Sequence, residues 1–275
     1  MSDLDELRGF HAKLMATASG SNDQRLERVF ELVPREAFLG PGPWRVMVNR
    51  RYVETPSADP AYVYQNVLIA LDGAKGINNG EPFLHAAWIG AVAPRSGETV
   101  VHIGAGTGYY TALLSLLVLP NGQVHGYEID LDLSSRAIDN LAPFEGVSVR
   151  HGDATQAEIE DCDLIYVNAG VVSPPSAWLK ALRPGGRLIF PWSPSTSLGI
   201  TLMLTRMEKG FEVRPLGPSW FIPCIGASDP EACIKAPSIP EARSIAAAWL
   251  TEDRQPDDTA IAICRDVWFS SMTAF

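Results

Sequence analysis

Hydrophobic residues along the chain fall first into helical spacing and later into short runs of strand length. Apolar residues recur every three or four positions over 3–18 and again over 26–33, which predicts two amphipathic helices. Pro34 ends the second helix, because proline cannot continue it. The stretch 44–75 has no clear period, and we expect it to be rich in loops. Pro82 stands at a favourable first-turn position of a further helix.

Apolar runs and helical stretches alternate from residue 99 onward. Strands are predicted at 100–103, 124–129, 147–150, 163–167 and 187–190. Two more strands, near 199–207 and 211–222, have no helix between them and should pair antiparallel. The alternation predicts an α/β fold with a mostly parallel sheet, helices on both faces and an antiparallel strand near its end.

The chain is expected to have three segments. We predict an N-terminal helical and loop segment over 1–75, a core over 76–226 and a C-terminal extension over 227–275. In the extension, the pattern favours a helix over 239–250 and a strand over 260–264.

Composition and charge limit the class of protein. Hydrophobic residues make up 46% and charged residues 20%, so we expect a packed globule. No apolar run is long enough to span a bilayer, and the acidic N-terminus has no signal-peptide pattern. Four scattered cysteines fit free thiols in the cytoplasm. The net charge of −10 argues against nucleic-acid partners. We expect neither a metal nor a membrane partner, and the oligomeric state stays open.

One stretch combines a buried strand, a tight turn and a helix start. Gly104, Gly106 and Gly108 follow the apolar run, and a helical pattern follows them. Glycines allow positive φ and a close ligand approach, and the helix N-terminus offers unpaired N–H groups. The stretch therefore predicts a nucleotide-type cradle that includes Ala105. The dinucleotide fingerprint needs a sixth-position glycine, where this chain has Tyr109, so a nicotinamide oxidoreductase is excluded.

Acidic residues lie at the ends of the next two strands after the glycine turn. Glu128 lies twenty positions after Gly108, where a carboxylate can accept both ribose hydroxyls, and Ile129 follows it. Asp153 can accept from an adenine amino group, and the Ala154 N–H can face a ring nitrogen. The ends of successive parallel strands meet at one edge, so we expect these groups to converge on one crevice.

The G-x-G-x-G spacing resembles that of the class I S-adenosylmethionine-dependent methyltransferases, which implies their Rossmann-like fold. Further segments resemble the protein L-isoaspartate (D-aspartate) O-methyltransferases, and the likeness runs from about residue 25 to 226. The segments are Leu32–Phe38 (V-P-R-x-x-F), Gly76–His85 (G-x-T-I-S-x-P), Val149–Asp153 (V-x-x-G-D), Asn168–Gly170 followed by Pro174 and Pro175, Leu182–Leu188 (L-x-x-G-G-x-L) and Phe221–Gly226 (F-V-P-L-x-G).

The resemblance implies S-adenosylmethionine as cofactor and the carboxylate of isoaspartyl residues, in proteins or peptides, as methyl acceptor. The cofactor-binding residues would be His102, Gly104, Ala105, Gly106, Gly108, Tyr109, Glu128, Ile129, Asp153, Ala154 and Asn168. The catalytic residues would be Asn79, Gly80 and His85. His85 matches a histidine that some family members carry beside the amino-acid end of the cofactor.

Two positions depart from the family pattern. Gly80 stands where the family has a serine that helps to position the substrate carboxylate. Asn78 or Asn79 can donate an amide instead, although a plain loop role fits both equally. His102 stands where the family has an acid, and a buried histidine satisfied by backbone is the alternative reading.

Other functions stay open at this point. One is methylation of a different peptide or of a small-molecule carboxylate, and another is a non-catalytic S-adenosylmethionine-binding module. Adenine or glutamine methylation is disfavoured because Asn168 is followed by Ala169 and not by the proline of an Asn-Pro-Pro-Tyr motif.

Overall fold

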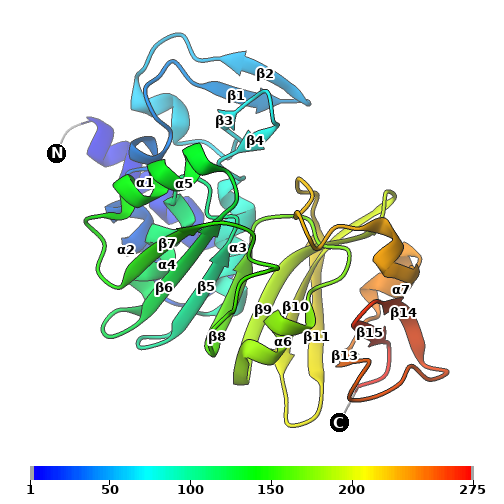
Figure 1. Ribbon diagram of the computed structural model, residues 1–275. Helices are drawn as coiled ribbons and strands as arrows, with labels where there is room; N and C mark the ends of the chain where they lie inside the picture. The colour runs from blue at the N-terminus through cyan, green and yellow to red at the C-terminus, as the bar shows by residue number, and fades with distance from the viewer. Residues whose placement is uncertain (1–2, 274–275) are drawn as a thin grey trace. The chain divides into compact units, whose positions relative to one another are not determined.

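The computed structural model describes residues 3–273, which form two compact units (Figure 1). The first unit comprises the chain up to Glu98 together with Ala105–His151. The second comprises Thr99–Gly104 and the chain from Gly152 onward. The glycine loop is therefore shared by the two units, because the chain passes from one to the other between Gly104 and Ala105.

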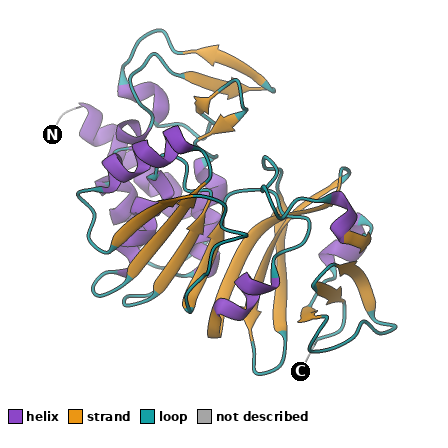
Figure 2. Cartoon of the chain, in the orientation of Figure 1, coloured by secondary structure: helices purple, strands orange, loops and turns teal. Residues whose placement is uncertain are grey.

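The first unit contains most of the helical residues, as Figure 2 shows. Its helices are α1 (Asp3–Ala18), α2 (Arg25–Leu32), η1 (Arg35–Phe38), η2 (Pro60–Val63), α3 (Pro82–Val92), α4 (Tyr109–Val118) and α5 (Leu131–Leu141). Helix α2 buries one stripe, Leu26, Val29 and Phe30, as its spacing predicts. Almost every residue of α4 is buried, which explains its apolar composition. The helices expected near 3–18, 26–33 and after Pro82 are confirmed.

Short strands complete the first unit. Strand β6 (Gln123–Glu128) pairs parallel with β7 (Val147–His151). The pairs β1 (Arg45–Val48) with β2 (Arg51–Glu54) and β3 (Ala70–Asp72) with β4 (Ile77–Asn78) are antiparallel. The stretch 44–75, expected to be rich in loops, therefore also contains the strands β1, β2 and β3 and the short helix η2. The β1–β2 hairpin turns through two residues at positive φ, Asn49 and Arg50. Its apolar residues form runs of only two or three, at 46–48 and 52–53, and all of its side chains are at least partly exposed, so no alternation of buried and exposed positions marks the strands.

The second unit is mainly sheet. Its strands, in spatial order, are β12 (Cys233–Lys235), β14 (Ala260–Cys264), β15 (Val267–Ser270), β13 (Ala247–Leu250), β11 (Phe211–Pro218), β10 (Leu198–Arg206), β9 (Leu182–Ser195), β8 (Cys162–Val167) and β5 (Thr99–Ile103). Strands β5, β8 and β9 run parallel, and the other neighbouring strands named here pair antiparallel. Short helices α6 (Ser176–Ala181), η3 (Pro230–Ala232) and α7 (Ile239–Arg243) connect them. The predicted α/β class is confirmed.

The C-terminal residues extend the antiparallel part of the sheet. The helix expected over 239–250 is correct only as far as Arg243, because Ala247–Leu250 forms β13 between β11 and β15. There Trp249 stacks on Trp268, its register partner, with ring centroids 4.6 Å apart. A short apolar run fits a helix or a buried strand equally well. Here Ala247–Leu250 is a strand because it pairs with both β11 and β15. The three-segment division of the chain stays a prediction.

No helix within residues 3–273 is long and apolar enough to cross a membrane.

Candidate functional site

The first-unit part of the glycine loop is tied to strand β6. Gly106 has φ +57° and its N–H donates to Glu128 Oε2 at 2.7 Å. The Ala105 N–H donates to the carbonyl of Tyr127 at 3.0 Å. Gly108, at φ +96°, precedes α4, and a Cβ there would lie 2.6 Å from Leu141. The loop therefore requires glycine both for its backbone conformation and for its packing.

Glu128 is almost completely buried at the end of β6, with 6% of its surface exposed. Its second oxygen, Oε1, accepts the Asp130 N–H at 3.0 Å, so backbone donors hold both carboxylate oxygens. Burial raises the pKa of Glu128 above its usual value. Each oxygen keeps lone pairs for further donors, so the carboxylate can accept a pair of hydroxyls. Ile129, which follows, is 42% exposed and Tyr109 is buried at the start of α4.

His85 fills the space that a side chain at position 80 would need. The His85 ring stacks on Tyr110, with centroids 3.7 Å apart and planes 21° apart. Gly80 has φ +58°, and a Cβ on it would lie 2.7 Å from His85 Cδ2 and 3.1 Å from Tyr110 Cε2. The structure therefore brings Gly80 and His85 into contact, with no room for serine unless the rings move.

Asn78 and Asn79 differ in how their side chains are used. Asn78 Oδ1 accepts the Gly80 N–H at 2.9 Å, and its Nδ2 donates to the Gly76 carbonyl at 3.3 Å. Asn78 is thus engaged in its own turn. Asn79 is buried, and its Oδ1 accepts from Arg35 Nε at 3.0 Å.

Arg35 is a residue whose importance the sequence reasoning missed. Its side chain is fully buried, and it also donates to four backbone carbonyls, those of Val63 (2.9 Å), Gln65 (3.1 Å), Val67 (2.9 Å) and Gly80 (3.1 Å). Burial lowers the pKa of Arg35 from its usual value, but a guanidinium stays protonated in proteins. The available signal was its place in the V-P-R segment, where it follows a proline and begins the short helix η1.

In the second unit, His102 and Asn168 meet at the ends of β5 and β8. Asn168 Nδ2 lies 2.8 Å from His102 Nε2. Complete burial lowers the pKa of His102 to about 3, so the ring is neutral and its Nε2 can accept from the amide. Asn168 Oδ1 is buried and has no hydrogen-bond partner within residues 3–273. Buried acceptors are rarely left unpaired, so this oxygen points to a ligand that donates.

The other predicted site residues of the second unit lie in or beside tight turns; they are Gly104, Asp153 and Ala154. Gly104 has φ +76°, and a Cβ on it would lie 3.5 Å from the Asn168 backbone. Asp153 Oδ1 accepts from both the N–H and the hydroxyl of Thr155, each at 2.8 Å. The buried Ala154 offers its carbonyl to Trp178 Nε1 at 3.0 Å. Asp153 Oδ2 has no partner in the part of the chain that the structure describes, so it can accept from a ligand.

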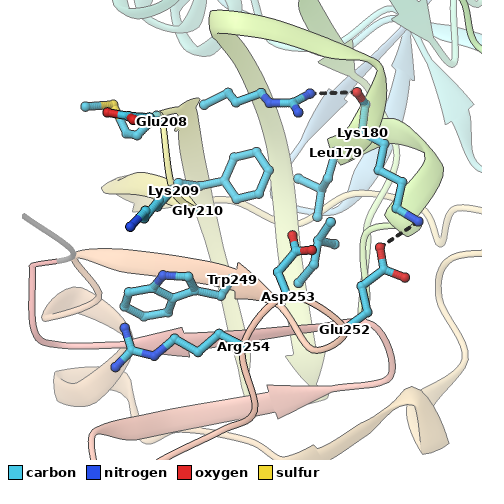
Figure 3. A pocket seen from close by; sticks show the side chains of 13 residues that line it. Leu179, Lys180, Glu208, Lys209, Gly210, Trp249, Glu252, Asp253 and Arg254 are labelled. Atoms are coloured by element: carbon cyan, nitrogen blue, oxygen red, sulfur yellow. Dashed lines mark hydrogen bonds and ion pairs between the residues drawn. The ribbon is translucent and has the colours of Figure 1, made fainter.

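A separate cavity of about 600 Å³ lies wholly in the second unit, and no predicted site residue lines it (Figure 3). Its wall carries the Lys180–Glu252 ion pair at 2.7 Å and the Arg206 guanidinium, which donates to the Lys180 carbonyl at 2.7 Å. Arg254 lies over the Trp249 ring, 4.4 Å from its centroid. These charges have partners within the protein. Across residues 3–273, no group of three or more His, Cys, Asp or Glu side chains could hold a metal ion.

Comparisons with known proteins agree with this picture. The family model described as protein-L-isoaspartate(D-aspartate) O-methyltransferase matches residues 18–229. A protein-L-isoaspartate O-methyltransferase of Methylorubrum extorquens is 30% identical over 234 residues, which cover 83% of this chain and 93% of that protein. Another, from Anaeromyxobacter sp., is 28% identical over 210 residues, 75% of this chain and 78% of its own length.

Solved structures show the same fold. One, titled protein-L-isoaspartate O-methyltransferase, superposes with a TM-score of 0.69 at 21% identity and covers 95% of this chain and 86% of its own. A putative protein-L-isoaspartate O-methyltransferase from Plasmodium falciparum, in complex with S-adenosyl-L-homocysteine, gives 0.64 at 16% identity, with coverages of 79% and 97%. The expected Rossmann-like class I methyltransferase fold is confirmed.

Proposed function

We propose a function from the family to which this chain belongs, the protein-L-isoaspartate (D-aspartate) O-methyltransferases. The chain is an S-adenosylmethionine-dependent O-methyltransferase, and it methylates the free carboxylate of isoaspartyl residues in proteins or peptides. The observation that carries this proposal is the family match over residues 18–229, which includes the glycine loop, Glu128 and the loop at Gly80. A cytoplasmic location is part of the proposal, in keeping with four free cysteine thiols.

Each unit offers groups that fit part of S-adenosylmethionine. In the first unit, the Glu128 carboxylate would hold the ribose hydroxyls, and Gly106 leaves space beside it, since a Cβ there would only touch Leu71 at 3.5 Å. In the second unit, the unpaired Asn168 Oδ1 would accept from the ammonium group. Asp153 Oδ2 would accept from the adenine amino group. Within each unit, the hydrogen-bonding chemistry of these residues therefore fits the corresponding part of the cofactor.

The chemistry needs little from the protein beyond alignment. S-adenosylmethionine supplies a methyl group on a sulfonium, which needs no further activation. The acceptor carboxylate is ionised at neutral pH, so no general base is required. What the chain must do is bind the carboxylate, orient one oxygen and exclude water. Asn79 and His85, on the loop and helix that follow β4, are the side chains proposed for this task, and Gly80 leaves room for the His85 ring.

The test is transfer of a labelled methyl group to a peptide that contains one isoaspartyl residue. The matched control is the same peptide with normal aspartate at that position. We expect label only in the isoaspartyl peptide and none with a Gly106→Asp variant, whose side chain would occupy the loop. Equal labelling of both peptides, or no labelling by the wild-type protein, would rule the proposal out.

Gly80 favours testing a second acceptor class. A chain without the family's serine can bind its carboxylate differently, so a different peptide carboxylate or a small-molecule carboxylate is the second candidate. A screen of carboxylates for a gain of one methyl group by mass spectrometry separates the two. A methyl ester on a small acid, with the isoaspartyl peptide unchanged, would favour this second candidate.

A further inference from the structure

Arg35 places a buried positive charge beneath the loop that carries Asn79 and Gly80. All five guanidinium hydrogen bonds are made, one to the Asn79 side chain and four to backbone carbonyls. Within residues 3–273 no carboxylate forms an ion pair with Arg35. A buried charge is costly unless it is balanced, so this cation favours a negative group close to the loop.

The same contact fixes which way the Asn79 amide faces. Arg35 Nε can only donate, so the Asn79 atom that meets it must be the oxygen. Nδ2 therefore points away from Arg35. Nδ2 has no hydrogen-bond partner within the described residues. It is also not completely shielded from solvent. The Asn79 N–H donates to the Ile69 carbonyl (2.8 Å), and the Tyr110 hydroxyl donates to the Asn79 carbonyl (3.4 Å), so the Asn79 backbone is held in place.

These contacts leave one amide donor free on the loop. The Asn78 amide is engaged in its own turn, and Gly80 has no side chain. A substrate carboxylate needs donors, and a donor that a neighbouring cation polarises is stronger than an isolated amide.

We propose that Arg35 is a positioning residue for the methyl acceptor: it locks Asn79 so that Nδ2 donates to the substrate carboxylate. Asn79 thereby supplies the donor that Gly80 lacks. This inference rests on the proposed function, because it assumes a carboxylate acceptor. It adds an arrangement of two residues that lie 44 positions apart in the sequence.

Asn79→Asp separates this role from a structural one. Aspartate has the same shape, still accepts from Arg35 Nε and gives the buried cation a counter-charge, so the melting temperature should not fall. It cannot donate, however, and it repels a second carboxylate. We expect the Michaelis constant for the isoaspartyl peptide to rise at least tenfold, while kcat and the Michaelis constant for S-adenosylmethionine change less than threefold.

The matched control is Asn78→Asp, which adds the same charge one residue away and keeps the bond from the Gly80 N–H. We expect less than a threefold change in the peptide Michaelis constant. Arg35→Lys keeps the charge but loses the Nε contact, so the peptide Michaelis constant should rise about fivefold in the wild-type background. In the Asn79→Asp background, adding Arg35→Lys should change the peptide Michaelis constant little, because that variant no longer has an amide to orient.

The outcomes separate failure of this inference from failure of the proposed function. An unchanged peptide Michaelis constant in Asn79→Asp, with wild-type activity present, overturns the inference and leaves the proposed function standing. An equal rise in Asn78→Asp also overturns it, because the effect would then be general charge repulsion. A wild-type protein that methylates no isoaspartyl peptide overturns the proposed function and the inference together. If Arg35→Lys fails to fold, the two asparagine variants still decide.

Discussion

Replacing Gly80 with alanine should destabilise the protein through two separable effects. The backbone at Gly80 has φ +58°, and holding a residue with a Cβ in this left-handed region costs about 1–2 kcal/mol. The new Cβ would also lie 2.7 Å from His85 Cδ2 and 3.1 Å from Tyr110 Cε2. Overpacking of this kind costs about 1–3 kcal/mol. The free energy of unfolding should therefore fall by about 2–5 kcal/mol.

Gly76 provides a matched control in the same loop. It has φ +71°, and a Cβ on it would meet nothing within 4 Å. Gly76→Ala should therefore cost only the backbone term, about 1–2 kcal/mol. Urea unfolding of both variants, followed by circular dichroism, gives the difference, which we expect to be about 1–3 kcal/mol.

A double-mutant cycle with His85→Ala identifies the ring as the obstacle. Gly80→Ala should be less costly in the His85→Ala background, with a coupling free energy of about 1 kcal/mol or more. Equal costs for the two glycine variants, or strict additivity in the cycle, would refute the claim that His85 occupies the space of the missing side chain.

Three further properties can be predicted. Because burial lowers the pKa of His102 to about 3, only the unfolded chain takes up this proton below pH 6.5. Stability should fall as the pH drops from 6.5 toward 3, by up to about 1.4 kcal/mol per pH unit from this residue. Urea unfolding at several pH values measures this dependence, and His102→Gln should remove the contribution of His102 to the change of the unfolding free energy with pH. Glu128→Ala should weaken S-adenosylmethionine binding at least tenfold by calorimetry, because the buried carboxylate is the proposed ribose acceptor; unchanged affinity would exclude that role. Iodoacetamide should label Cys233 before Cys224, as peptide mass mapping can show. Cys233 is half-buried and a hydrogen bond with Cys264 lowers its pKa, whereas burial raises the pKa of Cys224 to about 12; the reverse order would contradict these environments.

The features that sequence reasoning found are local in the chain. The glycine turn lies between an apolar strand and an apolar helix, and α4 is buried on nearly every side, so composition alone marks it. Glu128 could be found because an acid at the end of a strand is a pattern of only a few residues. These signals suffice for the fold class and for candidate cofactor residues, whose roles stay predictions.

What sequence reasoning missed depends on partners far away in the chain. The Ala247–Leu250 run forms a strand because β11 and β15 present open edges to it, which no local period reveals. The β1–β2 hairpin is at least partly exposed along its whole length, and its short apolar runs do not alternate with polar residues as those of a half-buried strand would. Arg35 and Asn79 are separated by 44 positions, so neither residue type nor spacing indicates that they bind each other.

The two asparagines proposed for the site are oriented by neighbours of opposite hydrogen-bonding character. Arg35 can only donate, so its Nε donates to Asn79 Oδ1. The Asn79 amide nitrogen is then left to donate to a negatively charged ligand group. Nε2 of the neutral His102 ring can accept from the Asn168 Nδ2 amide, which leaves Asn168 Oδ1 for a positively charged ligand group. A substrate carboxylate needs a hydrogen-bond donor, and the ammonium group of S-adenosylmethionine needs an acceptor. The two asparagines offer one of each. The replacement of the family's acid by His102 and of its serine by Gly80 is therefore compatible with methyl transfer, because a neighbouring amide can supply each missing contact.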